Sequence, residues 1–464
     1  MTSDQELLPT TRRALLHRIA VAQREGRAPS VVAAVVRGDR TVWEGARSCV
    51  DGHAPDGDVQ YRIGSLTKTF TAVLVLRLRD EGLLDLSDPL EKHLPGTGAG
   101  DVTVLQLLCH SGGLAAETPG PWWERSPGAL LSGLPEVLGE RPFRHEPGRR
   151  HHYSNPGYTL LGSLVEALRG RPWAEALRAE VLEPLGLHRT TVEPRAPHAG
   201  GWAVHPWADV MMPEPLEDLG VMAPAGVLWS TTADLARFAV FLARGDERVL
   251  SAATVREMRT AASPPEPGSA EAGYGLGVQL LNDGGRRLAG HTGSLPGFLA
   301  GLWLDEAEDL AAVVLANCTS GLPAAGTAAD LLRIVAEAEP RIPEPWRPLP
   351  MAEADPELVA LTGPWYWGTA PQLLRLLPGG ELELGPVGGT GRSARFLPGP
   401  DGTWTGVSGY YAGEVLRAVR RPDGSVGHLD LGSFVYTREP YDPAAPIPGG
   451  TDPEGWRGLD GTRG

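Results

Sequence analysis

A serine and a lysine three residues apart, Ser65 and Lys68, form the first pattern in the sequence that could perform chemistry. On a helix this spacing places both side chains on one face, so the amine can hydrogen-bond the hydroxyl and take its proton. Only two of the 42 lysines and arginines are lysines, Lys68 and Lys92. Since arginine supplies positive charge elsewhere, we interpret Lys68 as a proton-transfer amine rather than as a serine cap followed by a solvated lysine.

A second pattern, "HHYSNPGY", contains Tyr153 and Asn155 just before a predicted helix. Asparagine is also rare, so Asn155 is informative. A tyrosine near a lysine can be held as a phenolate or poised to become one, so Tyr153 could take the proton from Ser65 and return it to a leaving group. The alternative is a loop capped by Asn155.

The third pattern, "AGHTGSLPGF", predicts a strand that carries His291, Thr292 and Gly293. By itself it would indicate a polar edge strand. We expect Gly293 to let a substrate lie close to the backbone, and the amide of Ser294 to join that of Ser65 in an oxyanion hole.

The elements around these patterns predict an α+β fold. Residues 30–46 indicate two strands around a Gly-Asp turn, residues 66–82 a buried helix, and residues 274–317 a further set of strands. Several helical segments lie between the two groups of strands. The first domain is therefore predicted to be an antiparallel sheet with a helical insertion, spanning residues 1–338.

The remaining sequence predicts a second, smaller domain. Residues 339–357 are rich in proline and should form a stiff linker, residues 358–442 indicate a β-meander or small barrel, and residues 443–464 are expected to be disordered. Arg438 in the last predicted strand could hold a substrate carboxylate. The alternative is a surface arginine that pairs with a nearby acid.

Composition excludes several classes of function. The net charge of −15 argues against binding to nucleic acid or to an anionic membrane surface. Three scattered cysteines and the absence of an apolar leader or spanning segment indicate a cytoplasmic protein. We expect no cofactor and no metal, because no carboxylate or cysteine recurs at ligand spacing beside the histidines of the central region, His110, His145, His151 and His152.

Taken in order, the three patterns resemble the penicillin-recognising serine enzymes, in the branch of class C β-lactamases, D-alanyl-D-alanine carboxypeptidases, D-aminopeptidases and esterases. The likeness covers residues 10–335 and includes "LLCHSGGL" and "APAGVLWSTTADLARF". It implies a β-lactamase-like sheet with a helical domain and a site between them. It also implies that Ser65 is acylated, that Lys68 and Tyr153 transfer protons, and that Asn155 binds the substrate amide.

One departure bears on the substrate. Where classical members carry a lysine whose charge meets the substrate carboxylate, this chain has His291. Histidine there is similar to D-aminopeptidases, to family esterases and to penicillin-binding-protein-type thioesterases, which release and cyclise nonribosomal peptides and carry a lipocalin-like β-domain after the catalytic one. The resemblance therefore favours a thioesterase and cyclase, acting on a peptidyl substrate that a carrier protein could present. The alternatives are a hydrolase of small esters or D-amino-acid peptides and, less favoured, a non-catalytic binding protein.

Overall fold

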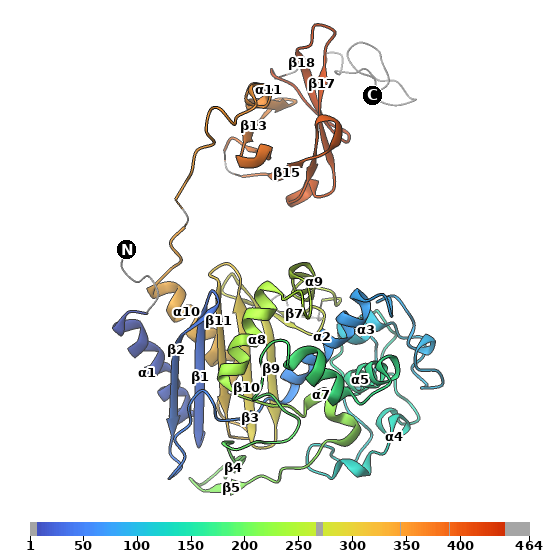
Figure 1. Ribbon diagram of the computed structural model, residues 1–464, viewed down its shortest axis with the longest axis vertical. Helices are drawn as coiled ribbons and strands as arrows, with labels where there is room; N and C mark the ends of the chain where they lie inside the picture. The colour runs from blue at the N-terminus through green and yellow to red at the C-terminus, as the bar shows by residue number, and fades with distance from the viewer. Residues whose placement is uncertain (1–6, 266–271, 344, 389, 441–464) are drawn as a thin grey trace. The chain divides into compact units, whose positions relative to one another are not determined.

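The computed structural model describes residues 7–265, 272–343, 345–388 and 390–440 of the chain (Figure 1). The chain divides after Ile342 into two compact units, residues 1–342 and 343–464. The predicted 443–464 tail lies outside the described residues.

The first unit is organised around a seven-stranded antiparallel sheet (Figure 1). Its strands follow the order β2 (Arg40–Ser48), β1 (Ser30–Arg37), β11 (Leu310–Ala316), β10 (Phe298–Asp305), β9 (Arg286–Leu295), β8 (Gln279–Asp283) and β7 (Ala272–Tyr274). Strands from the two ends of the unit therefore meet inside the sheet, where β1 pairs with β11. The predicted antiparallel sheet with a helical insertion is confirmed.

The interior strands β1 and β11 are buried on both faces, which explains their continuous apolar sequences. Side chains alternate between faces along a strand. Val31 and Val35 accordingly pack into one hydrophobic core with α1 (Pro9–Glu25) and α10 (Ala324–Ala338). Val32 and Val36 pack into the larger core, which includes α8 (Thr232–Arg244).

The helical insertion completes the larger core. Its central helices are α2 (Thr67–Asp80), α5 (Asn155–Arg169) and α7 (Ala223–Gly226), which contact one another. The buried apolar face of α2 explains the run of hydrophobic residues predicted as a core helix. Shorter elements complete the unit: α3 (Val104–Leu108), α4 (Leu134–Leu138), α6 (Trp173–Leu177), α9 (Ala252–Met258), and the strand pairs β3 (Tyr61–Arg62) with β6 (Trp229–Ser230) and β4 (Trp202–Val204) with β5 (Met211–Pro213).

The second unit is an eight-stranded antiparallel meander that nearly closes into a barrel. Its elements are α11 (Pro356–Leu361), β12 (Gly363–Trp367), β13 (Ala370–Leu376), β14 (Leu382–Pro386), β15 (Ala394–Pro398), β16 (Thr403–Gly406), β17 (Val415–Arg420), β18 (Val426–Leu431) and β19 (Phe434–Tyr436). The first and last strands approach where the amide of Tyr366 donates to the carbonyl of Thr437 at 2.7 Å. The predicted small β-barrel is confirmed. Between α10 and α11, the described residues form neither helix nor strand.

Candidate active site

Ser65 lies in a single 3₁₀ turn, η1 (Gly64–Leu66), which leads directly into α2. Gly64 has a φ of +51°, and a Cβ there would lie 2.6 Å from the amide nitrogen of Ser294 on β9. Only glycine permits both this conformation and this approach. The amides of Ser65 and Ser294 therefore belong to adjoining backbone segments, as an oxyanion hole requires.

Gly293 on β9 packs against the segment that precedes the Ser65 turn. A Cβ at this position would lie 1.8 Å from the carbonyl oxygen of Ile63. The close approach at Gly293 is made by the chain just before the nucleophile turn. Gly293 thus fixes Ser65 against the sheet. The expectation that Gly293 also lets a substrate lie close to the backbone stays a prediction.

Lys68 is fully buried one turn after Ser65. Its Nζ donates to Ser65 Oγ at 3.0 Å and to the carbonyl of Ala225 in α7 at 2.7 Å. Desolvation lowers the pKa of Lys68 to about 7, against smaller opposing effects of Glu117 and Glu124. A large fraction of the amine is therefore neutral near pH 7, where it can accept the Ser65 proton.

Tyr153 lies just before α5, with its ring centroid 5.0 Å from Lys68 Nζ and its phenol near the Ser65 side chain. Desolvation raises the pKa of Tyr153 above its usual range. Burial disfavours the charged form, so of the two expected states the raised pKa favours a tyrosine that is poised to lose its proton over a resting phenolate. Tyr153 enters the reaction as a neutral hydroxyl that can relay a proton, and Lys68 is the better base.

His110 holds the Tyr153 segment in place. Its Nδ1 accepts from the amide of Ser154 at 3.1 Å, its carbonyl accepts from the amide of His152 at 2.7 Å, and its ring lies 4.1 Å from that of Tyr153. Since Nδ1 is an acceptor, the neutral ring carries its proton on Nε2. The sequence signal for this positioning role is the motif "LLCHSGGL", which contains His110.

Asn155 is the first residue of α5, beside its Ser154 cap. Its Nδ2 donates to Glu117 Oε1 at 2.6 Å, and its amide donates to the carbonyl of Ala116 at 2.9 Å. Glu117 was not singled out from the sequence, because an isolated glutamate in a loop carries no distinctive pattern. Within the described part of the chain, Asn155 Oδ1 is buried without a hydrogen-bond partner.

His291 is buried in β9 and uncharged. Its Nδ1 donates to the carbonyl of Thr292 at 2.6 Å, so its Nε2 is free to accept from the hydroxyl of Tyr274 at 2.9 Å. Desolvation, followed by the charge of Lys68, lowers the pKa of His291 to about 3. His291 therefore carries no positive charge near neutral pH. Thr292 is half-buried beside it, and Ser294 is exposed.

Arg438 follows β19 in the barrel unit. One guanidinium nitrogen donates to the carbonyl of Thr362 at 2.9 Å, the other donates at 2.5 Å to the carbonyl of Ala360, and the group lies 4.0 Å from the ring of Trp365. This fork holds the start of the barrel against its end. The prediction that Arg438 binds a substrate carboxylate remains untested, and such a contact would compete with these bonds.

The described residues contain no cluster of three histidine, cysteine or acidic side chains arranged to hold a metal ion. No helix among them is long and apolar enough to span a membrane.

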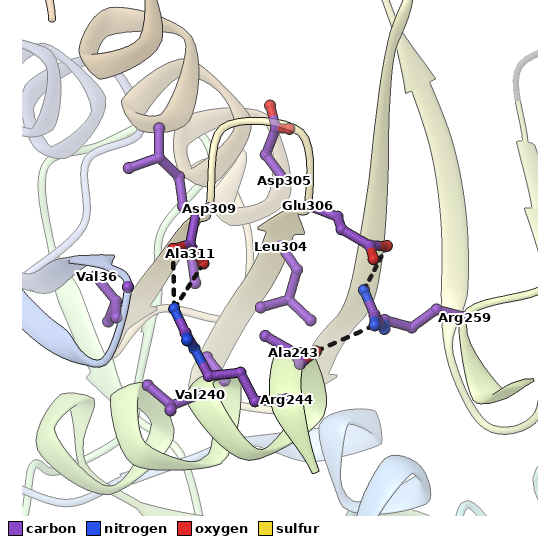
Figure 2. A pocket seen from close by; sticks show the side chains of 13 residues that line it. Val36, Val240, Ala243, Arg244, Arg259, Leu304, Asp305, Glu306, Asp309 and Ala311 are labelled. Carbon is purple, nitrogen blue, oxygen red and sulfur yellow. Dashed lines mark hydrogen bonds and ion pairs between the residues drawn. The ribbon is translucent and has the colours of Figure 1, made fainter. Parts of the chain in front are cut away.

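A small cavity of about 60 Å³ between α8 and the turn joining β10 to β11 is lined by charged side chains (Figure 2). Arg244 pairs there with Asp309 at 2.9 Å, and Arg259 pairs with Glu306 at 2.7 Å. Its arginines therefore already have partners, which indicates a structural role.

This fold and its serine–lysine pair define a serine hydrolase that works through an acyl-enzyme. The family model described as Beta-lactamase matches residues 16–337, and the chain belongs to the beta-lactamase family. A second model, for a domain of unknown function named DUF7586, matches residues 354–438. The predicted kinship with penicillin-recognising serine enzymes is confirmed.

Two curated proteins are similar to this chain in sequence. Penicillin-binding protein 4 of Amycolatopsis lactamdurans is 29% identical over 287 residues, covering 57% of this chain and 74% of that protein. The chain spans about half, 53%, of the length of Protein flp from Staphylococcus aureus, which is 26% identical over 271 residues.

Two solved structures are similar to this chain in fold. D-amino acid amidase from Ochrobactrum anthropi SV3, complexed with D-phenylalanine, has a TM-score of 0.60 and 25% identity, and the match covers 71% of this chain and 99% of that one. SurE with D-Leu has a TM-score of 0.56 and 25% identity, and covers 93% of this chain and 100% of that one. The second match therefore includes most of the barrel unit.

Proposed function

We propose that the protein is a cytoplasmic penicillin-binding-protein-type thioesterase, which takes a peptidyl group from a carrier-bound thioester onto Ser65 and releases it by cyclisation. The observation that carries the acyl-transfer chemistry is the 3.0 Å contact between Ser65 and a buried Lys68 whose pKa is lowered to about 7. An ordinary serine is a poor nucleophile, and an adjacent neutral amine activates it.

In the proposed sequence, neutral Lys68 takes the Ser65 proton as Oγ attacks the thioester carbonyl. The amides of Ser65 and Ser294 stabilise the developing oxyanion. The thiolate then leaves and gains a proton that Lys68 supplies directly or through Tyr153. An amine of the same peptide attacks the resulting ester, and its proton returns to Ser65 Oγ by the same route.

The neutral His291 supports a substrate without a carboxylate on its leaving side. A carboxypeptidase or β-lactamase substrate has a carboxylate there, whereas the leaving thiol of a thioester has no such charge. A buried imidazole whose pKa is lowered to about 3 offers no positive charge at neutral pH. We therefore expect slow or no turnover of benzylpenicillin.

The likeness to SurE with D-Leu over 93% of the chain supports a substrate that contains a D-residue. A second candidate, hydrolysis of D-amino-acid esters or amides, is supported by the likeness to D-amino acid amidase. The two candidates share every proposed catalytic residue and differ in the acceptor, which is an amine in the first and water in the second.

The test is intact-mass measurement after incubation with a peptidyl N-acetylcysteamine thioester that ends in a D-residue. We expect an acyl adduct on the wild-type protein and on a Ser132→Ala control, and none on Ser65→Ala. A cyclic product supports the thioesterase, and a linear acid supports the hydrolase. Equal labelling of Ser65→Ala would show that the nucleophile is assigned wrongly.

A further inference from the structure

The side-chain amide of Asn155 is oriented by Glu117, and this orientation decides what the site offers to a substrate. A carboxylate can only accept hydrogen bonds, so the amino end of Asn155 must face Glu117 Oε1, 2.6 Å away. The carbonyl end, Oδ1, then belongs to a side chain that is only 7% exposed, and it has no partner within the described residues. A buried acceptor left unpaired costs about 1–3 kcal/mol.

This orientation refines the role that the resemblance implied for Asn155. Glu117 takes one of the two N–H donors of Asn155, and the second can still meet a substrate carbonyl. Asn155 Oδ1 remains as an additional, unpaired acceptor within the described residues. The group on the substrate that fits this position is therefore a donor, and an N–H donor would satisfy Oδ1.

Glu117 has acceptor capacity to spare. Its Oε1 accepts from Asn155, and its Oε2 accepts from the indole Nε1 of Trp123 at 2.8 Å. A carboxylate has about four lone-pair positions, so these two bonds leave room for further donors. Glu117 is itself exposed, whereas Trp123 is buried and fixes its direction. The carboxylate is thus held in place with an open side.

The charge of Glu117 reaches the catalytic groups. It opposes the fall in the pKa of Lys68, and it adds to the rise in the pKa of Tyr153. A second carboxylate, Glu124, has a raised pKa, mainly through burial and partly through Glu117. The neighbouring Arg125 is already paired with Glu214 at 2.5 Å. This side of the site therefore favours a cation supplied from outside.

We propose that Glu117 and Asn155 form a subsite for a primary ammonium group of the substrate, which donates to the Glu117 carboxylate and to Asn155 Oδ1. An ammonium carries three donors and makes charge-assisted hydrogen bonds with carboxylates. The inference rests on the proposed acyl transfer at Ser65 and specifies its substrate as an amine.

Two amines have this chemistry. One is the α-amino group of the residue that acylates Ser65, and the other is the amine that resolves the acyl-enzyme. In the second case the bound ammonium first gives one proton to solvent. The amine then attacks the ester carbonyl, the new C–N bond forms, the bond to Ser65 Oγ breaks, and the surplus proton passes to Oγ through Lys68 or Tyr153.

The experiment compares substrates within each protein at pH 6.5, where α-amines are largely protonated. The first pair is D-phenylalanine methyl ester and its N-acetyl form, scored as the ratio of their kcat/KM values. The second measurement is the ratio of aminolysis to hydrolysis when L-leucinamide competes with water for the N-acetyl acyl-enzyme. Because each ratio is taken within one protein, a changed pKa of Lys68 cancels.

We expect Glu117→Gln to lower at least one ratio by about tenfold or more, which is the worth of a charged hydrogen bond. Glu117→Asp should keep part of the preference, and Glu140→Gln, which removes an exposed charge elsewhere, should keep all of it. A fall in the first ratio identifies the acyl residue as the amine, and a fall in the second identifies the acceptor.

Glu117→Gln with both ratios unchanged would overturn the subsite. Hydrolysis of 4-nitrophenyl acetate distinguishes a failure of the ammonium subsite from a failure of the proposed acyl transfer at Ser65. A wild-type protein that is not acylated at Ser65 by this ester refutes the acyl-transfer proposal itself. A Glu117→Gln protein that still cleaves the ester is folded and has a working Ser65, so its ratios report on the subsite alone.

Discussion

The two compact units differ in what they bury. The first encloses Lys68, His110 and His291, each at most 2% exposed, beside the Ser65 turn. The described core of the barrel is made of leucine, alanine and aromatic side chains, with His428 as its buried polar residue. Buried ionisable groups cost stability unless they are paired. The first core therefore includes residues that serve the reaction at the expense of folding, while the second is built for packing.

The contrast between the two cores is tested most strongly by replacing the buried Lys68 with an apolar residue. We expect Lys68→Met to lower acylation by at least about a thousandfold, since the Ser65 base is lost, yet to raise the free energy of unfolding. Lys68→Arg should be almost as inactive, because a guanidinium stays protonated. Burst kinetics with an activated ester and urea unfolding measure the two effects, with Lys92→Met as the control. A less stable Lys68→Met protein would contradict the contrast.

The barrel should respond in the opposite way. Trp365 is fully buried, and its indole donates to the carbonyl of Leu361 at 2.8 Å. We expect Trp365→Ala to lower the free energy of unfolding of the barrel by about 3–5 kcal/mol through the cavity that it leaves. Thermal unfolding followed by calorimetry should show a shifted barrel transition. Turnover of a small ester by the folded protein should not change, and a large loss of it would link the barrel to the chemistry.

Tyr153→Phe tests the neutral-relay role in the first core. Removing the hydroxyl should lower turnover by about tenfold to a hundredfold, typical of a lost proton-transfer group, with little change in unfolding. Steady-state kinetics provide the measurement, and Tyr410→Phe on the barrel serves as the control. A Tyr153→Phe protein with full activity would leave Lys68 to handle every proton alone.

Lys68 should also give the first unit a pH signature. Acylation is expected to rise with pH around a midpoint near the pKa of Lys68, about 7, and to fall about tenfold per unit below it. Glu117→Gln should move this midpoint down, because Glu117 opposes the lowering of the pKa of Lys68.

The lowered pKa of Lys68 also predicts that the free energy of unfolding depends on pH. Between pH 7 and the unfolded value near 10.4, the unfolded chain holds a proton at Lys68 that the folded chain lacks, so unfolding becomes less favourable as pH rises. The stability advantage of Lys68→Met over wild type should therefore shrink across this window. Parallel urea titrations at several pH values measure it, and a constant difference would contradict the lowered pKa.

Arg438→Ala is expected to have the smallest effect. Losing the bonds to Ala360 and Thr362 should destabilise the barrel by about 1–2 kcal/mol, since they are charge-assisted but partly exposed. Processing of a peptidyl thioester, compared between Arg438→Ala and Arg417→Ala, tests the remaining prediction of carboxylate binding. Unchanged processing would leave Arg438 with its structural role alone.

Sequence reasoning predicted what depends on local spacing and residue rarity. The Ser65–Lys68 pair, the strands and the barrel follow from periodicity, turn residues and unusual composition. It missed what depends on burial and on contacts between distant segments. The charge states of Tyr153 and His291 are set by desolvation, and Glu117 meets Asn155 only through the fold.

Gly293 shows the same limit. A glycine near the end of a strand indicates that another group lies close to its backbone, but only the three-dimensional structure identifies that group. Here a Cβ would meet the carbonyl oxygen of Ile63.

The contrast between the two lysines has a practical consequence for handling the protein. The side chain of Lys92 is 58% exposed on the surface, whereas Lys68 is fully buried. Amine-reactive reagents attack accessible, deprotonated amines, so coupling through Lys92 should leave the catalytic amine untouched. The chain could therefore be attached to a solid support by ordinary lysine chemistry while it remains a working catalyst.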